Sequence, residues 1–484
     1  MVRSTRYPSL QYEGVERSLP ATAASLSSAL QTPCRTPVVL DDDPTGTQTV
    51  HNMTVLTTFD QDLFEQQLRM KEPGFFILTN SRALPPDQAS SLLRTILTNL
   101  CNASRVVDIY VDVVLRSDST LRGHFPLEAQ LAHSIMGPFP TWVLAPAFFE
   151  GGRVTINDVH YAREGDLLTP VAETPFAQDR SFGFTSSNLR EWASEKYRQE
   201  GDGLVPEMTS IDISQLRKVD GPNTVAALLD KVSVSGDSAQ PHLVILNGFS
   251  RHDYEVFVAG ESLARNTSPR LYRTGASFVS ARLGISPIPP IPPAQLFRDE
   301  HAKTGGLIVA GSYVPKTTAQ LKALLARCSG HLAHFEVDVG DLLVATEERI
   351  LQIVRDTASH AEHALEQGKD CLISTSRKLI YDTEASASLS IGNTVSNVLV
   401  KIVQAINLRP RYVIAKGGIT SSDIATKAMK IKTARVIGQA APGVPLWRSQ
   451  TPESKWVDIP YVVFPGNVGG QELLGEVVES YRLL

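Results

Sequence analysis

Short apolar runs rich in Val, Ile and Leu recur along the whole chain, and each ends in glycines or polar residues. "TPVVLDD", "TWVLAPAF" and "HLVILNGFS" are examples from the first half, and "GGLIVAGS", "RYVIAKGG" and "YVVFPGN" from the second. Stretches such as "DQASSLLRTILTNL" and "ERILQIVRDTASHAEHALEQG" lie between these runs and carry apolar residues at helical spacing. Buried strands that alternate with amphipathic helices are typical of α/β proteins with a mostly parallel sheet.

The proline-rich stretch "GISPIPPIPPAQLF", residues 284–297, interrupts this alternation. Its five prolines block both helix and central strand, so we interpret it as a stiff connector, with a surface loop inside one domain as the alternative. The predicted organisation is an N-terminal extension with a short helix at 1–34, a first domain at 35–285, a linker at 286–298 and a second domain at 299–484. We expect each domain to be a mostly parallel sheet flanked by helices, with a ligand cleft between the two domains.

The composition is that of an ordinary globular chain, with 42% hydrophobic and 20% charged residues and a formal charge of -5. This charge does not indicate a binder of nucleic acid or membrane surfaces, so we expect small-molecule partners. The sequence contains no apolar run of about 18 residues and no secretory h-region near residue 1. The four cysteines are far apart, which predicts free thiols in a reducing compartment and makes the cytoplasm the expected location.

Glycines and hydroxyl residues follow predicted strands of the second half, in "AGSYVPKTTAQ", "AKGGITSSDIATKAM" and "PGNVGGQELL". Glycine lets backbone N–H groups approach a phosphate closely, and the N-terminus of a following helix adds unpaired donors. We therefore predict a nucleotide site at these turns, with Thr317 or Thr318 capping one helix and Ser421 and Ser422 capping another. The turns match neither G-x-x-x-x-G-K-[ST] nor G-x-G-x-x-G, which disfavours a standard P-loop or dinucleotide fold.

Charged residues follow the predicted strands of the first half instead, in "DDDPTGTQ", "LRSDSTLRGHF" and "APAFFEGGRVTINDVHYARE". Two arginines around an acid and hydroxyls can grip a small hydroxylated carboxylate, because arginine binds carboxylates in bidentate pairs. A surface cluster of salt bridges is the alternative, but the position at strand ends favours a ligand site. His51, His124 and His160 lie near these segments without metal-ligand spacing, so we expect them to be structural.

Taken together and in this order, "DDDPTGTQ", "RSDSTLRG", "APAFFEGGRVTINDVHY", "TPVAETPFAQD", "GSYVPKTTAQ", "KGGITSSD" and "GNVGG" resemble the motifs of the four-carbon acid sugar kinase family. The resemblance covers nearly the whole chain after residue 36. It implies a two-domain α/β enzyme whose N-terminal domain binds a sugar acid and whose C-terminal domain binds ATP. Members of the family phosphorylate the terminal hydroxyl of threonate, erythronate or 3-oxo-tetronate-type acids, using ATP and magnesium.

The resemblance also implies which residues form the site. Those on the substrate side are Asp42, Asp43, Arg116, Asp118, Ser119 and Arg122. Those on the ATP side are Ser312, Gly417, Gly418, Ile419, Thr420 and Gly466. We expect Asp43 or Asp42 to deprotonate the attacking hydroxyl, with Asp118 as the reserve. The magnesium ion is expected to bridge the phosphates, and its protein ligands stay unassigned.

Several positions depart from the family pattern. Ile419 stands where many members carry glutamate, "PGNVGG" lacks an aromatic residue, and the first segment has an extra Asp41 and Pro44. These changes indicate a distinct subgroup, with another substrate and a structural Asp41. A NAD-dependent hydroxyacid dehydrogenase and a non-catalytic protein that binds a sugar acid or nucleotide are the alternatives; the absent G-x-G-x-x-G opposes the first, and Ile419 supports the second. A homodimer is expected by analogy with α/β enzymes of this size.

Overall fold

The computed structural model describes residues 7–8, 35–200, 203–234, 240–297, 303–311, 314–376 and 385–482. The chain forms two compact units: unit 1 is Met1–Val50 with Phe59–Pro287, and unit 2 is His51–Thr58 with Ile288–Leu484. The division after Pro287 falls inside the proline-rich stretch. The segment His51–Thr58, which the sequence analysis placed in the first domain, joins unit 2 through its strand β3 (Met53–Leu56). The short helix expected before residue 35 lies outside the described residues.

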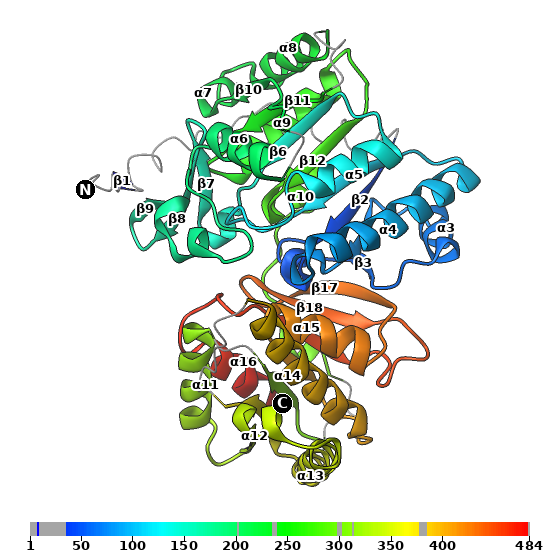
Figure 1. The fold of residues 1–484 in the computed structure, drawn as a ribbon, viewed down its shortest axis with the longest axis vertical. Helices are drawn as coiled ribbons and strands as arrows, with labels where there is room; N and C mark the ends of the chain where they lie inside the picture. Colours follow the sequence, from blue (N-terminus) through cyan, green and yellow to red (C-terminus); the bar gives the residue numbers. More distant parts are fainter. Residues whose placement is uncertain are drawn as a thin grey trace. The chain divides into compact units, whose positions relative to one another are not determined.

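Unit 1 contains a sheet with the strand order β10-β11-β6-β12-β5-β2-β4; Figure 1 labels β10, β11, β6, β12 and β2 of this sheet. Each adjacent pair in this series runs parallel. The strand bounds are β2 Thr36–Asp41, β4 Phe75–Leu78, β5 Val111–Arg116, β6 Thr141–Ala145, β10 Met208–Ile211, β11 His242–Leu246 and β12 Arg270–Thr274. Both faces of strands such as β2 are buried, which explains why the sequence shows continuous apolar runs instead of alternation.

Helices connect these strands, as the sequence analysis predicted. Their bounds are α3 Gln61–Arg69, α4 Pro86–Val107, α5 Leu127–Met136, α6 Leu189–Glu200, α7 Ile213–Leu216, α8 Gly221–Val234, α9 Arg251–Leu263 and α10 Ala276–Arg282. The 3₁₀ helices η1 (Pro44–Thr47) and η2 (Ser81–Ala83) lie in the connections that leave β2 and β4. The helix predicted from "DQASSLLRTILTNL" is confirmed as α4, which starts one residue earlier at Pro86, where a missing N–H costs no hydrogen bond.

A second, antiparallel sheet of unit 1 was not predicted. Its strand order is β1-β9-β8-β7, with bounds β1 Tyr7–Pro8, β7 Arg153–Ile156, β8 Val159–Glu164 and β9 Leu167–Pro170. Asn157 and Asp158 connect β7 to β8, with φ angles of 50° and 64°. Asn and Asp tolerate this left-handed conformation, which a two-residue hairpin turn requires at both positions. "INDV" is therefore a hairpin signal that the sequence analysis missed.

Unit 2 contains a mixed sheet with the order β3-β17-β18-β19-β16-β13-β15-β14. The strands β19, β16, β13, β15 and β14 run parallel, while β3, β17, β18 and β19 pair antiparallel. The bounds are β13 Leu307–Ala310, β14 Leu332–Val337, β15 Asp370–Thr375, β16 Val413–Lys416, β17 Thr433–Ala441, β18 Val444–Ser449 and β19 Pro460–Phe464. The antiparallel hairpin β17–β18 was not predicted.

Two helices of unit 2, α11 and α15, begin elsewhere than the sequence analysis predicted. The bounds of the helices of unit 2 are α11 Pro315–Arg327, α12 Val339–Val344, α13 Glu347–Glu366, α14 Ala385–Ala405, α15 Gly418–Asp423, the π-helical turn η8 Ile424–Ala428 and α16 Leu473–Arg482. Thr317 and Thr318 do not cap α11, because Val314 is its N-cap and Pro315 its first residue. Ser421 and Ser422 lie inside α15, whose N-cap is Gly417. Both capping predictions were wrong.

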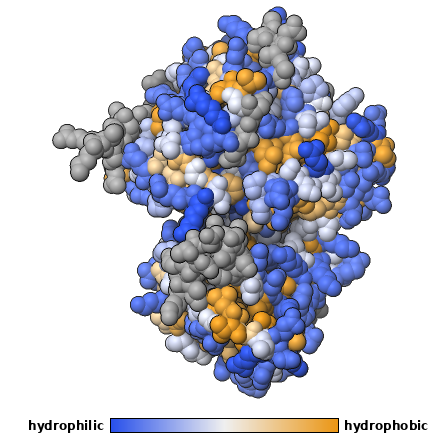
Figure 2. Space-filling view, in the orientation of Figure 1, coloured by the Kyte–Doolittle hydropathy of each residue, from blue (hydrophilic) through white to orange (hydrophobic). Residues whose placement is uncertain are grey.

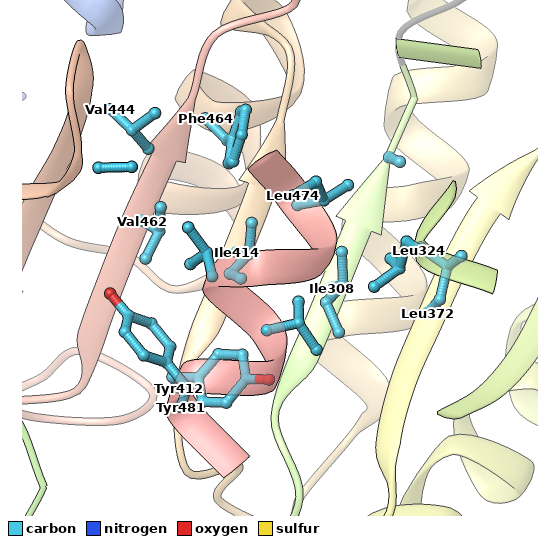
Figure 3. Packing of buried hydrophobic residues seen from close by; sticks show 14 of the residues in the cluster. Ile308, Leu324, Leu372, Tyr412, Ile414, Val444, Val462, Phe464, Leu474 and Tyr481 are labelled. Atoms are coloured by element: carbon cyan, nitrogen blue, oxygen red, sulfur yellow. The ribbon is translucent and has the colours of Figure 1, made fainter. Parts of the chain in front are cut away.

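The core of unit 2 packs α11 and α16 against the parallel strands (Figure 3). Leu324 of α11 and Leu474 of α16 contact the apolar side chains of β13, β15, β16 and β19. The rings of Tyr412 and Tyr481 meet edge to face, with centroids 5.1 Å apart. Burial of these side chains holds α11 and α16 against the sheet.

On the face shown in Figure 2, hydrophilic side chains predominate and hydrophobic ones lie in small separate areas. Cys101, Cys328 and Cys371 are free thiols, which confirms the prediction for these three residues, and Cys34 lies outside the described residues. Among the described helices, none is both long and apolar enough to cross a membrane.

Candidate functional site

Three adjacent strands of unit 1 end at the same level. Asp41 of β2 lies opposite Arg116 of β5, and Arg116 lies opposite Thr274 of β12. The end of β5 and the segments that follow β2 and β5 hold the substrate-side residues predicted from the sequence. Because the carboxyl ends of parallel strands meet at one edge, residues far apart in the chain become neighbours there.

Asp41 lies beneath the turn that follows β2. Its carboxylate accepts a hydrogen bond from Arg116 Nη1 at 3.2 Å, and the backbone of Gly46 lies so close that an added Cβ would overlap it. Burial raises the pKa of Asp41 to about 8, although Arg116 lowers it. Asp41 therefore supports the turn from below, as its place outside the family pattern suggested.

Asp43 is fully engaged by its neighbours. One carboxylate oxygen accepts a hydrogen bond from the backbone N–H of Thr45 at 2.8 Å, and the other pairs with Arg82 Nη2. Burial raises the pKa of Asp43, but Arg82, Arg116 and Thr45 outweigh burial and lower it below its ordinary value. This carboxylate caps η1 and anchors Arg82, so it has little capacity left to accept a substrate proton.

Asp42 differs from both of its neighbours. It is 2% exposed, and neither carboxylate oxygen has a hydrogen-bond partner in the described structure. Arg82 Nη1 and Arg116 Nη1 each lie 3.7 Å from Oδ1. Burial raises the pKa of Asp42 to about 6, against the effect of the two arginines. The geometry thus leaves Asp42 able to accept a hydrogen bond from a ligand hydroxyl.

Asp118 and Arg122 bind each other after β5. Arg122 Nε donates to Asp118 at 2.7 Å, and Arg82 Nη1 lies 3.5 Å from the same carboxylate. Burial opposes ionisation of Asp118, but Arg122 and Arg82 hold its pKa well below the usual range. Arg122 also pairs with Asp179 at 3.5 Å. The two predicted ligand residues therefore already satisfy much of each other's bonding.

His160 supports the predicted residue Ser119. Its Nε2 lies 2.8 Å from the Ser119 carbonyl oxygen, and its Nδ1 lies 2.9 Å from Thr155 Oγ1. Since a carbonyl only accepts, Nε2 donates and Nδ1 accepts. Burial lowers the pKa of His160 to about 4, so the ring is neutral near pH 7. His124 bonds the carbonyls of Ser81 and Leu84 in the same way, so both histidines are structural here.

Sequence reasoning missed other charged residues of this cluster. Arg82 of η2 lies among Asp42, Asp43 and Asp118. Glu128 of α5 accepts a hydrogen bond from Ser81 Oγ at 2.7 Å, and burial raises its pKa. The position of "NSRAL" after a predicted strand was a usable signal for Arg82. No local signal pointed to Glu128, because it lies inside a helix.

Three neighbouring strands of unit 2 also end at one level. Ala310 of β13 lies opposite Lys416 of β16, and Lys416 lies opposite Phe464 of β19. Helix α11 is hydrogen-bonded to the segment that follows β19: Gln320 Nε2 donates to the carbonyls of Val468 and Gly470 at 3.0 and 2.9 Å.

The predicted ATP-side residues come together at these ends. Gly311 approaches Thr420 so closely that an added Cβ would lie 2.8 Å from its Oγ1. The Gly417 N–H donates to the carbonyl of Phe464, and Thr317 Oγ1 donates to the carbonyl of Gly466. The structure thus brings Gly417, Gly418, Ile419, Thr420 and Gly466 into one region of unit 2. The predicted contact Ser312 lies outside the described residues.

This region offers backbone donors more than side chains. Gly417 has a φ of 110°, and the N–H groups of Gly418, Ile419 and Thr420 form the first turn of α15, where helices leave donors unpaired. The Ile419 side chain is 56% exposed. Lys416 is fully buried, with Nζ on the Pro465 carbonyl, and burial lowers its pKa to about 7. Turns of this kind suit the phosphates of a nucleotide.

The described residues fit a protein-held metal poorly. No group of three or more His, Cys, Asp or Glu side chains suited to a metal ion occurs among them. Near the turns of unit 2, Asp423 is engaged by Ser396 Oγ and by Lys427 Nζ at 2.7 Å.

Two family models match the chain. A sugar-binding N-terminal domain matches residues 37–282, and a nucleotide-binding C-terminal domain matches residues 307–474. The D-threonate kinase of Salmonella typhimurium is 24% identical over 413 residues, which are 82% of this chain and 86% of that protein.

Solved structures agree on the fold. A Haemophilus influenzae protein of the same family model has a TM-score of 0.58 at 15% identity, covering 92% of this chain and all of that one. A Salmonella typhimurium protein described as a proposed tRNA synthase has a TM-score of 0.63 at 16% identity, covering 92% of this chain and 98% of that one. The predicted family is therefore confirmed: this chain belongs to the four-carbon acid sugar kinase family.

Proposed function

We propose that the protein transfers the terminal phosphoryl group of ATP to the terminal hydroxyl of a four-carbon sugar acid, such as threonate, erythronate or 3-oxo-tetronate. The nucleotide-binding domain and the similarity to D-threonate kinase support a kinase over a nicotinamide-dependent dehydrogenase. The charged cluster of unit 1 lies in the part matched by the sugar-binding model, and the glycine turns lie in the part matched by the nucleotide-binding model.

The observation that carries this proposal is the Asp42 carboxylate. It is buried and lacks hydrogen-bond partners, whereas Asp41 and Asp43 are both occupied. With a pKa of about 6, Asp42 is largely ionised at pH 7 and still basic enough to take a proton as the oxygen–phosphorus bond forms. We assign Asp42, rather than Asp43, to orient and deprotonate the attacking hydroxyl.

The arginines of unit 1 hold Asp42 in its ionised form and give the cluster positive charge. Arg82 contacts three carboxylates, and Arg116 lies between Asp41 and Asp42. A site for an anionic acid needs such charge, because burial of a carboxylate without a counter-ion is costly. The predicted roles of Arg116, Asp118, Ser119 and Arg122 in substrate binding remain part of this proposal.

In unit 2, the turn at Gly417 and the first N–H groups of α15 would hold the phosphates of ATP. Phosphoryl transfer depends on positioning and on neutralising charge, which backbone donors supply without side-chain chemistry. ATP brings the phosphoryl group, and magnesium, where present, is expected to be held mainly by phosphate oxygens and water. Transfer requires the two ligands to meet, so the predicted cleft between domains belongs to the proposal, and the homodimer stays a prediction.

The test is an assay of ADP formation with ATP, magnesium and a panel of four- and five-carbon acids, D-threonate first, with products identified by mass. The expected product is 80 Da heavier than the acid, because one phosphoryl group replaces a proton. No ADP above background with any acid would contradict the proposal. Protection against thermal unfolding by NAD but not by ATP would favour the dehydrogenase instead.

A further inference from the structure

Arg273 is a buried arginine of β12. It lies one residue before Thr274, the last residue of the strand, which lies opposite Arg116 of β5. Its guanidinium lies over the rings of Phe125 and Trp192, at 5.3 and 4.9 Å from their centroids. Nη2 donates to the backbone carbonyl of Arg122 at 3.3 Å, while Nη1 is buried without a hydrogen-bond partner in the described structure. The side chain is thus fixed by aromatic stacking and keeps an unused donor.

The other arginines of the cluster differ from Arg273 in their counter-ions. Arg82 and Arg122 form ion pairs with aspartates, and Arg116 Nη1 lies 3.7 Å from Asp42 Oδ1. No described carboxylate forms an ion pair with Arg273, and burial lowers its pKa. Glu128, Asp42 and Asp118 oppose that shift from a distance, and the Glu128 Oε1 accepts a hydrogen bond from Ser81. A buried guanidinium without an ion-paired carboxylate is a ready position for a ligand anion.

Arg273 and Asp42 both lie close to Gly123. A Cβ added at Gly123 would lie 3.2 Å from Asp42 Oδ2 and 3.8 Å from Arg273 Nη2. Gly123 has a φ of 122°, which other residues rarely adopt. The glycine therefore keeps the space between the carboxylate and the guanidinium free of side-chain atoms. A small acid carries its two distinctive groups, a carboxylate and a terminal hydroxyl, at opposite ends of a short chain.

We propose that Arg273 binds the carboxylate of the substrate and so selects sugar acids over neutral polyols. Arg116 and Arg122, the arginines predicted from the sequence, contact Asp41 and Asp118, so Arg273 adds a carboxylate contact to the binding roles proposed for them. Aromatic stacking fixes the plane of the Arg273 guanidinium, which favours a planar, bidentate partner. This inference rests on the proposed function for the identity of the ligand, but its test reads binding separately from turnover.

The experiment compares the wild type with Arg273→Met, Arg273→Lys and the matched control Arg270→Met. Arg270 lies on the same strand and is equally buried, but it points to the opposite face and pairs with Glu261. Each protein is titrated calorimetrically with D-threonate and with D-threonamide, in which a neutral amide replaces the carboxylate. Turnover of both compounds gives KM and kcat.

In Arg273→Met, the Kd and KM for D-threonate should rise at least about 30-fold, because one partner of a buried charge pair is lost. The values for D-threonamide should change less than about threefold, so the preference for the acid disappears. Arg273→Lys should raise the Kd and KM for D-threonate by an intermediate amount, since lysine keeps the positive charge but lacks the paired N–H donors of a guanidinium. Arg270→Met should keep the wild-type ratio of acid to amide.

Unchanged D-threonate affinity in either folded Arg273 variant would overturn the inference, as would equal losses for acid and amide. If Arg273→Met does not fold, the ratio of acid to amide affinity in Arg273→Lys tests the inference instead. Acid binding by the wild type without ADP formation, abolished in Arg273→Met, would reject the kinase and keep the inference. A wild type that binds neither D-threonate nor any other acid of the panel would overturn the inference even if it turned over ATP.

Discussion

The strand ends of unit 1 and unit 2 present opposite kinds of chemistry on similar parallel sheets. After β2 and β5, buried aspartates and arginines contact one another, as in the pair of Asp43 and Arg82. After β16 and β19, glycines such as Gly417 and Gly466 prevail, α15 begins with free N–H groups, and the Ile419 side chain is exposed. In the proposed function, the first would recognise its ligand through ionised side chains and the second through the backbone.

This difference teaches what each site tolerates. Buried charges stay ionised only when their partners are in place, so a substitution in unit 1 should alter pKa values and stability together. Backbone donors depend on local conformation, so unit 2 should tolerate side-chain changes but not changes of φ. The predictions below test this contrast, from the largest expected effect to the smallest.

Asp42→Asn should have the largest effect on activity. Loss of a general base typically lowers the rate by about 10²–10⁴-fold, and the amide cannot take the hydroxyl proton. The fold should persist, because Asp42 makes no hydrogen bond and its nearest ion-pair distances are 3.7 Å. Activity is measured as ADP formation, and folding by urea denaturation. A variant with wild-type turnover would remove Asp42 from the reaction.

Asp43→Asn should show the reverse pattern. Removal of this carboxylate takes from Arg82 its closest partner and weakens the cap on η1. Breaking a buried ion pair costs about 3–5 kcal/mol, so the free energy of unfolding should fall by that order. The urea midpoint measures the loss, with Asp42→Asn as the comparison. If Asp42→Asn proved the less stable of the two, Asp42 would be the structural residue and Asp43 the candidate base.

Gly417→Ala should weaken unit 2 through the backbone alone. At a φ of 110° and ψ of 147°, alanine is strained by about 1–3 kcal/mol. The start of α15 should shift and its N–H groups should lose their alignment, so ATP affinity should fall as well as stability. Gly330→Ala is the matched control, because an added Cβ there meets nothing within 4 Å. Equal ATP affinity and equal stability of the two variants would contradict a nucleotide site built from the backbone at Gly417.

The sequence predicted the glycine turns well and the charged cluster only in part, for a physical reason. A strand–glycine–helix turn is a local pattern, so Gly417 and Gly466 could be placed before the structure was known. The charged cluster depends on contacts between distant residues, such as Arg82 with Asp43 and Arg273 with the Arg122 carbonyl. Strand β12, "RLYRT", carries two arginines and lacks a long apolar run, so it gave no strand signal.

Sequence reasoning also left the roles within "DDDPTG" open. Adjacent aspartates point in different directions along a strand end, and their partners come from other strands. Only the structure shows that Arg116 engages Asp41, that Arg82 engages Asp43, and that Asp42 is left without a hydrogen bond. The helix starts were misplaced because hydroxyl residues that resemble N-caps lie inside α11 and α15, which begin earlier, at Pro315 and just after Gly417.

Asp41 should make stability fall as the pH rises. Its pKa is about 8 in the folded protein and 3.8 in an unfolded chain, so the folded state holds the proton throughout this window. Stability therefore declines with pH between these values, by up to about 1.4 kcal/mol per pH unit. Urea denaturation at a series of pH values would measure this slope, and Asp41→Asn should remove it. A wild type and variant with parallel pH profiles would show that Asp41 does not titrate in this way.

Ile419→Glu should have the smallest effect, although it restores the residue common in the family. The side chain is more than half exposed, so the change should alter the free energy of unfolding by no more than about 0.5 kcal/mol. The N–H of residue 419 remains in place, and a glutamate at a helix N-terminus is compatible with the dipole. ATP affinity should therefore stay within about threefold of the wild type. A gain of tenfold or more in kcat would show that unit 2 relies on a side chain here, and the contrast between a side-chain site and a backbone site would fail.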